Sequence, residues 1–132
     1  MSKTKQNTIS EYLSEFCKFC DDMEQAYNYN YDAVNRLDKM TQDFLHIIEL
    51  KTRNYKERAK TATQLAQCRQ ERRDAKDFLE DVDSLIKFLR SDKGIACMKA
   101  LRQVVGSTRK AEEYHKTREY KFRIISDDYK NE

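Results

Sequence analysis

Two arginines and a glycine near the C-terminal end of the sequence have the spacing of an anion-binding helix face. Arg102, Gly106 and Arg109 follow one another at steps of four and three residues, so they share one face with Lys99. An arginine presents a planar fork of N–H donors that fits a phosphate, and a glycine lets a ligand approach the backbone. A glycine inside a helix costs about 1 kcal/mol relative to alanine. The pattern therefore indicates either a phosphate site or a point where two helices touch.

A second basic cluster lies at the centre of a long amphipathic helix that we predict from Asn54 to about Arg90. Its members are Arg69, Arg72, Arg73 and Lys76. A charge on a buried helix face must be paired or must hold an anion, because desolvating it alone is costly. Acidic residues nearby favour local pairing, such as Arg73 with Asp77 four residues on. An anion site between helices is the alternative.

Nothing in the sequence has the pattern of a catalytic centre or of a metal site. It lacks a glycine-rich phosphate loop, a nucleophile elbow and the HExxH motif. Cys17-x-x-Cys20 has zinc-like spacing, but no second pair follows it, and a cysteine in an amphipathic helix commonly acts as a small buried apolar residue. We therefore expect a binding protein that is not an enzyme and needs no cofactor or metal.

Composition predicts a mainly helical chain that forms one domain over residues 1–132. The sequence has no proline, two glycines and 37% charged residues, so few residues would stop a helix. A hydrophobic content of 39% is low for a lone globule of this size, and we expect a homo-oligomer. We expect flexible ends at 1–7 and 126–132. With no membrane-length apolar run and a polar N-terminus, we expect a cytoplasmic protein without a membrane partner.

Helix boundaries follow from capping and turn residues. Thr8 or Ser10 opens the first helix, Asn28–Asn30 is a predicted turn, and the second helix ends near Leu50. A break at 52–54 lets Asn54 cap the long helix, although a continuous helix from residue 31 to residue 90 is the competing arrangement.

The C-terminal third is predicted as a turn, a helix and a strand. Ser91–Gly94 stops the long helix, with Gly94 in a left-handed turn, and the last helix spans roughly Ile95–Lys116. From Glu119 the apolar side chains alternate with basic ones, which is typical of a strand. A lone strand needs a partner, which is a copy in another subunit or a short N-terminal segment. The predicted fold is thus a helical hairpin or bundle with one long amphipathic helix and a short C-terminal β-strand, in an intertwined homo-oligomer.

Charge is divided unevenly along the chain. Residues 1–50 carry five basic and nine acidic side chains, whereas residues 51–132 carry 21 basic and 14 acidic ones. The basic half predicts an anionic partner, and the 23 acidic residues argue against bulk nucleic acid as that partner.

Several short motifs between Ala59 and Arg123 resemble a family of small phage proteins, the Thoeris anti-defence proteins of the first type. The motifs are Ala-Lys-x-Ala-Thr-x-Leu at 59–65, Glu-Arg-Arg-x-x-Lys-Asp at 71–77, a short glycine turn, Arg-Lys-x-Glu at 109–112, and Thr-Arg-x-Tyr-x-x-Arg at 117–123. They cover about half of the chain. Two departures concern Glu113, where the family tends to have a basic residue, and Phe122, where it usually has a proline.

The resemblance implies a sponge, which is a homo-oligomer in the cytoplasm of the infected bacterium that sequesters cyclic ADP-ribose isomers without cleaving them. Some family members also hold cyclic oligonucleotides. By position it implies Phe88 as the stacking surface for adenine and Asp92 as the acceptor for a ribose hydroxyl. It implies Arg109, Arg118 and Arg123 as phosphate ligands. The alternative function is a helical protein inhibitor, such as an anti-CRISPR, whose basic residues dock on an acidic host protein.

Overall fold

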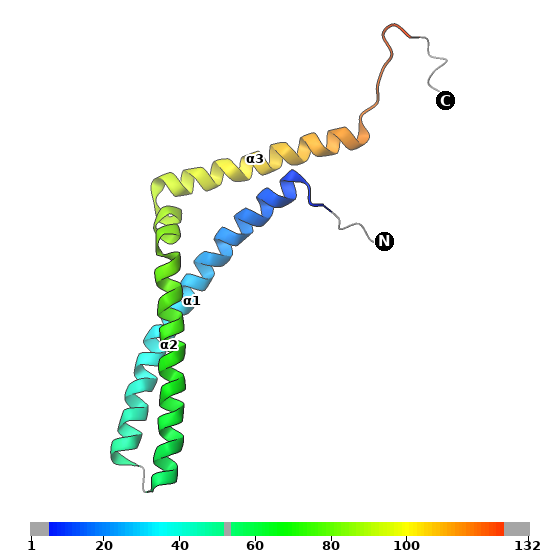
Figure 1. Ribbon diagram of the computed structural model, residues 1–132. Coiled ribbons are helices and arrows are strands. Elements are labelled where there is room, and N and C mark those ends of the chain that lie inside the picture. Colours follow the sequence, from blue (N-terminus) through cyan, green and yellow to red (C-terminus); the bar gives the residue numbers. More distant parts are fainter. Residues whose placement is uncertain (1–5, 52–53, 126–132) are drawn as a thin grey trace, which may run out of the picture.

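Three α-helices make up the fold. The computed structural model describes residues 6–51 and 54–125, of which 88% are helical. The helices are α1 (Ile9–Leu50), α2 (Tyr55–Arg90) and α3 (Asp92–Thr117). In Figure 1, α1 and α2 form a hairpin, and α3 turns away from the end of α2 and runs towards the N-terminal end of α1. None of the described helices is both long and apolar enough to cross a membrane.

The first helix is continuous, so the turn predicted at Asn28–Asn30 is wrong. Thr8 caps α1 by accepting a hydrogen bond from the Glu11 backbone N–H at 3.3 Å. Asn30 donates to the carbonyl of Ala26 within the helix at 2.8 Å. The asparagine side chain therefore bonds to the helix that it was expected to end.

The break predicted at 52–54, between the second predicted helix and the long helix, is confirmed at its two edges. α1 ends at Leu50, and Asn54 caps α2 by accepting a hydrogen bond from the Glu57 backbone N–H at 2.9 Å. Residues 52 and 53 of this break lie outside the described residues. A continuous helix across it is excluded. α2, with 36 residues, spans the range predicted for the long helix, but α1 is longer, with 42 residues.

Ser91 alone joins α2 to α3. Its N–H donates to the carbonyls of Lys87 and Phe88, and its hydroxyl accepts from the Gly94 N–H at 3.0 Å. The left-handed turn predicted at Gly94 is wrong, since no described glycine has a positive φ. Gly94 lies instead in the first turn of α3, where a Cβ would be 1.7 Å from the Phe88 carbonyl oxygen. Gly94 is thus needed for the close approach of two helices.

Two small apolar clusters hold the helices together. Where all three helices meet, the buried residues are Cys17, Cys20, Leu89, Met98 and Val105. Further along the hairpin, Ala33 and Leu37 of α1 pack against Cys68 of α2. Among the described residues, no large side chain is fully buried. The core is therefore thin, which leaves much apolar surface in contact with solvent.

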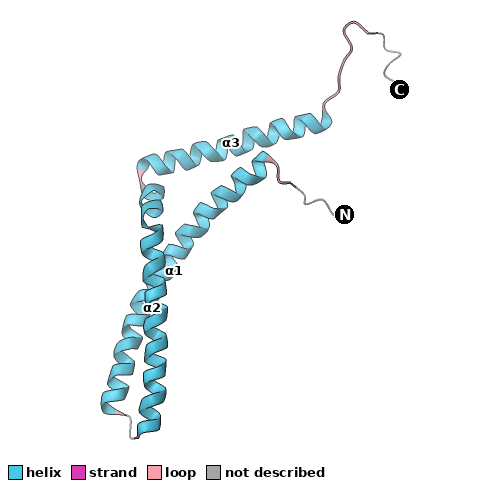
Figure 2. Cartoon of the chain, in the orientation of Figure 1, coloured by secondary structure: helices cyan, strands magenta, loops and turns pink. Residues whose placement is uncertain are grey.

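The predicted C-terminal strand is wrong. Residues 118–125 have no regular secondary structure, and Figure 2 draws them as a loop. The Tyr120 and Phe122 rings meet edge to face at 5.6 Å, and Ile124 is 97% exposed. A strand needs a second strand for its hydrogen bonds, and residues 6–51 and 54–125 contain none. The predicted flexible ends lie largely outside the described residues, which exclude 1–5 and 126–132.

Candidate anion-binding groove

A groove runs between the N-terminal half of α1 and α3. It has two hollows that share Asp21 of α1 and Arg102 of α3 in their walls. One hollow has a volume of about 310 Å³ and is lined by Ser14, Cys17, Lys18, Asp21, Arg102, Val105 and Arg109. The other has a volume of about 200 Å³ and is lined by Cys20, Asp21, Glu24, Leu89, Ile95, Met98 and Arg102. The larger hollow is within the range of ligand sites in proteins.

The two ends of the groove differ in charge. The larger hollow is bordered by Lys18, Arg102 and Arg109 and by a single carboxylate, Asp21. The smaller hollow contains Arg102 with two carboxylates and an apolar floor. An anionic group is therefore favoured at the larger hollow, and hydroxyl groups or an apolar ring are favoured at the smaller one.

The ion pair between Asp21 and Arg102 crosses the groove where the hollows meet. The Arg102 Nη2 and Asp21 Oδ1 atoms are 3.0 Å apart, and both side chains are half exposed. Lys18 bonds to Asp22 at 2.8 Å on the same helix. Within residues 6–51 and 54–125, Arg109 has no ion-pair partner. Arg109 is thus the cation of the groove with its donors available to a ligand.

Three of the seven predicted site residues lie together on α3. Arg102 and Arg109 line the groove, and Gly106 lies between them. A Cβ on Gly106 would meet no atom within 4 Å, so Gly106 does not serve a contact between two helices within the chain. The backbone there is open to an approaching ligand or to solvent.

The other four predicted site residues do not line either hollow. Phe88 and Asp92 are exposed at the corner between α2 and α3, and Asp92 occupies the first turn of α3, where its charge suits the helix dipole. Arg118 is the C-terminal cap of α3, and Arg123 lies in the extended segment after it. Both arginines are exposed, so within one chain the basic groups do not converge as predicted.

Sequence reasoning missed the α1 side of the groove, which is Lys18 and Asp21. The spacing of residues within α1 does not indicate that Asp21 meets another helix. The opposite charges of the two halves of the chain were the available signal, since they favour contacts between an acidic α1 and a basic α3.

The far end of the groove is closed by contacts between Ser10 and Glu112. The Glu112 carboxylate accepts from the Ser10 backbone N–H at 2.9 Å and from its hydroxyl at 2.6 Å. The hydroxyl bond, followed by the backbone bond, lowers the pKa of Glu112. These contacts fix α3 against the start of α1 and so set the width of the groove.

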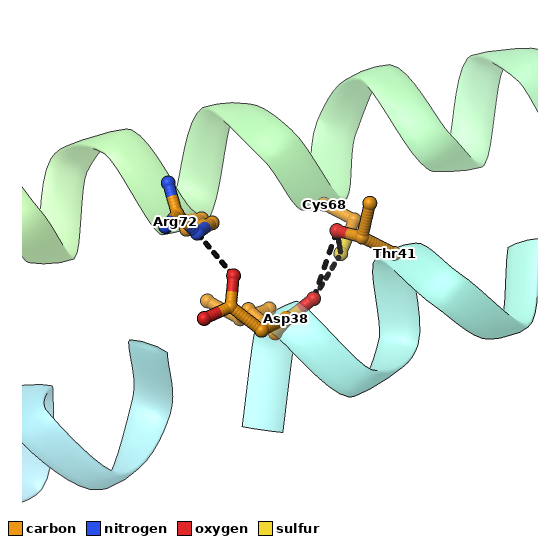
Figure 3. A network of polar contacts seen from close by, with 5 residues as sticks. Asp38, Thr41, Cys68 and Arg72 are labelled. Carbon is orange, nitrogen blue, oxygen red and sulfur yellow. Dashed lines mark hydrogen bonds and ion pairs between the residues drawn. The ribbon is translucent and has the colours of Figure 1, made fainter. Parts of the chain in front are cut away.

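The basic cluster of α2 is anchored by a contact between helices. Arg72 pairs with Asp38 of α1, next to a network in which Thr41 and Cys68 both donate to the Leu37 carbonyl (Figure 3). The expected Arg73–Asp77 pair is absent from the ion pairs of residues 6–51 and 54–125. Arg69, Arg73 and Lys76 remain exposed around a hollow of about 340 Å³.

Three of the four cysteines have the character of core residues, whereas Cys97 is exposed. Cys17, Cys20 and Cys68 are buried and free, and burial raises the pKa of the Cys20 thiol. In the part of the chain that the structure describes, no group of three or more potential ligands is placed to hold a metal ion.

Comparisons with protein-family models, with curated proteins and with solved structures found no match. The resemblance to the Thoeris anti-defence proteins therefore has no support from these comparisons.

Proposed function

We propose that this chain is a phage or prophage anti-defence protein that binds and sequesters a cyclic ADP-ribose-type signal without cleaving it. The observation that carries the proposal is the Arg109 end of the groove. Its three cations face a single carboxylate, and Arg109 has no ion-pair partner within the described residues. A bound phosphate would accept hydrogen bonds from Arg109 and would compete with Asp21 for Arg102.

The rest of such a ligand fits the other end of the groove. Asp21 and Glu24 offer acceptors for ribose hydroxyls, and Ile95 and Met98 offer an apolar surface for a base. The carboxylates of the smaller hollow would repel a long nucleic acid, because such a polymer carries a phosphate on every nucleotide.

The proposal includes a homo-oligomer in the cytoplasm of the infected bacterium. Arg118 and Arg123 do not line the groove of their own chain, so in the proposed assembly they serve the groove of a neighbouring chain. Phe88 is 43% exposed, and in the proposed assembly it would contact the ligand bound in the groove of a neighbouring chain. Cyclic oligonucleotides are a second ligand class that the same phosphate-binding groups would accept.

One experiment separates sequestration from catalysis. The protein is incubated with a cyclic ADP-ribose isomer, the free ligand is removed by filtration, and the protein is then denatured by heat. We expect the free ligand to be depleted and then to be recovered intact. Recovery of a hydrolysed product would contradict a non-enzymatic role, and an undepleted filtrate would contradict binding.

A protein inhibitor of the anti-CRISPR kind is the second candidate function. It is favoured by the exposed Arg69, Arg73 and Lys76 on α2, which lie apart from the groove and could dock on an acidic protein surface. A stoichiometric host partner that is lost on reversing these three charges, without any small-molecule binding, would favour this candidate.

A further inference from the structure

An apolar stripe with heptad spacing runs along α1 over most of its length. Starting at residue 9, the stripe recurs at alternating steps of three and four residues as far as residue 47, which is the spacing that places side chains along one seam of a helix pair. We call this stripe the α1 seam. Its middle contains Met23 and Ala26, and Asn30 is its one strongly polar position.

The C-terminal part of the α1 seam is covered by α2. Ala33 and Leu37 are buried against Cys68, and Met40 and Phe44 pack on the same cluster. In this part of the fold, the α1 seam packs against a helix that lies alongside it.

The cover ends where α2 ends. Arg90 is the last residue of α2, and its guanidinium contacts Glu24 and Asn28 of α1 and lies 4.8 Å from the Tyr27 ring centroid. α1 continues beyond this point to Ile9, and Figure 1 shows its N-terminal part diverging from α2 towards α3. Leu89, near the end of α2, reaches only the cluster with Cys17 and Cys20 on the neighbouring face of α1.

Beyond the end of α2, the α1 seam is exposed. Ile9 is 67% exposed, Tyr12 55%, Phe16 49% and Phe19 48%, and the Phe16 and Phe19 rings stack on each other at 6.5 Å. α3 does not cover these residues, because it packs on the neighbouring face of α1 that contains Cys17 and Cys20.

The exposed side chains of the seam form one apolar patch. An aromatic side chain has about 150–250 Å² of surface, so the three half-exposed aromatic side chains and the more exposed Ile9 together leave roughly 400 Å² open per chain. Two such patches facing each other would remove about 800 Å² from water before any neighbouring residue is counted.

We propose that the N-terminal part of the α1 seam, residues 9–19, is the surface through which two copies of this chain associate. The same stripe is already an interface where α2 covers it, so a helix of matching period is the partner that its spacing fits. A second copy brings such a helix with the same aromatic residues, and its association would remove the exposed seam of both chains.

This surface is distinct from the anion-binding groove. The residues of α1 that line the larger hollow, such as Ser14, Lys18 and Asp21, lie at steps that place them on the far side of the helix from Tyr12, Phe16 and Phe19. The inference deepens the proposed function by assigning the contact of the homo-oligomer. It does not depend on the ligand, so either could fail without the other.

Sedimentation velocity of the full chain over a wide range of protein concentrations tests the proposal. We expect the unmodified chain to sediment as a dimer or a larger assembly and to dissociate on dilution. Phe16→Asp should weaken this association by about tenfold or more, as for a residue at the centre of an interface. Tyr55→Asp, at an 87% exposed position at the start of α2, is the matched control and should leave association unchanged.

Circular dichroism accompanies each sample, because a loss of helix would explain a loss of association in another way. Tyr12→Lys provides a second change on the seam and should act like Phe16→Asp. A wild-type chain that stays monomeric at every concentration would overturn the proposal. So would folded Phe16→Asp and Tyr12→Lys variants that associate as strongly as the wild type.

Discussion

Glu112 on α3 accepts two hydrogen bonds from Ser10 on α1, one from the backbone N–H at 2.9 Å and one from the hydroxyl at 2.6 Å. The N–H groups of a first helical turn have no partner within their own helix, and a carboxylate there also suits the positive end of the helix dipole. Ser10 is only 4% exposed, so the contact replaces water at a buried helix start. Residues 102 positions apart are thereby joined at one end of the groove.

Acid should weaken the contact between Ser10 and Glu112. Because the pKa of Glu112 is lowered in the folded chain, its carboxylate stabilises the fold above its ordinary pKa of 4.5. That contribution is lost as the pH falls below 4.5 and through the folded-state pKa. Thermal unfolding followed by circular dichroism from pH 7 to pH 3 should show a falling midpoint. Glu112→Gln should have a lower midpoint at pH 7 and a weaker pH dependence, and equal profiles would contradict this role.

The two glycines should respond to alanine in opposite directions. Gly94→Ala places a Cβ 1.7 Å from the Phe88 carbonyl oxygen and should cost about 1–3 kcal/mol in the free energy of unfolding, as overpacking does. Gly106→Ala meets no atom within 4 Å and should stabilise the chain by up to about 1 kcal/mol through helix propensity. Chemical denaturation of both variants checks the pair, and a destabilised Gly106→Ala would show that the backbone there has a neighbour.

Capping residues explain why the boundaries of α2 were predictable. The Asn54 side chain accepts a hydrogen bond from the Glu57 N–H, and the Ser91 side chain accepts one from the Gly94 N–H. Each capping bond joins residues only three positions apart, so it can be recognised in the sequence. The continuity of α1 was not predictable in this way. Asn28 accepts a hydrogen bond from Arg90 at the C-terminal end of α2, and this contact between distant residues has no local sequence pattern. The strand prediction was wrong for a related reason. Alternating apolar and basic side chains in residues 119–125 favour a strand only where a second strand can accept and donate the backbone hydrogen bonds.

Arg72 should be replaceable by an apolar residue. It occupies the line of half-buried positions of α2 between Leu65 and Leu79, and its partner Asp38 is partly exposed. Asp38→Ala should therefore cost about 0.5–1 kcal/mol. Arg72→Leu should be neutral or stabilising, since an apolar side chain fits the seam without desolvating a charge. Urea denaturation of the two variants and their combination measures this, and a larger loss for Arg72→Leu than for Asp38→Ala would refute it.

Only part of the groove could be predicted from the sequence. Arg102 and Arg109 were found because their spacing fixes a helix face. Which part of α1 faces them depends on the sharp corner at Ser91 and on the contact between Ser10 and Glu112, and both are tertiary features without a local pattern. Arg118 and Arg123 follow the end of α3, so helical spacing could not place them.

Calorimetric titration with a cyclic ADP-ribose isomer at low salt tests the central claim most directly. The comparison is between the wild type, Arg109→Ala and Arg73→Ala, in which the control removes an exposed arginine from the α2 hollow. We predict that the wild type binds, that Arg109→Ala binds about tenfold or more weakly through the loss of charged hydrogen bonds, and that Arg73→Ala binds as the wild type does. A wild type that releases no binding heat and leaves the ligand free, or equal affinities for all three proteins, would contradict the account.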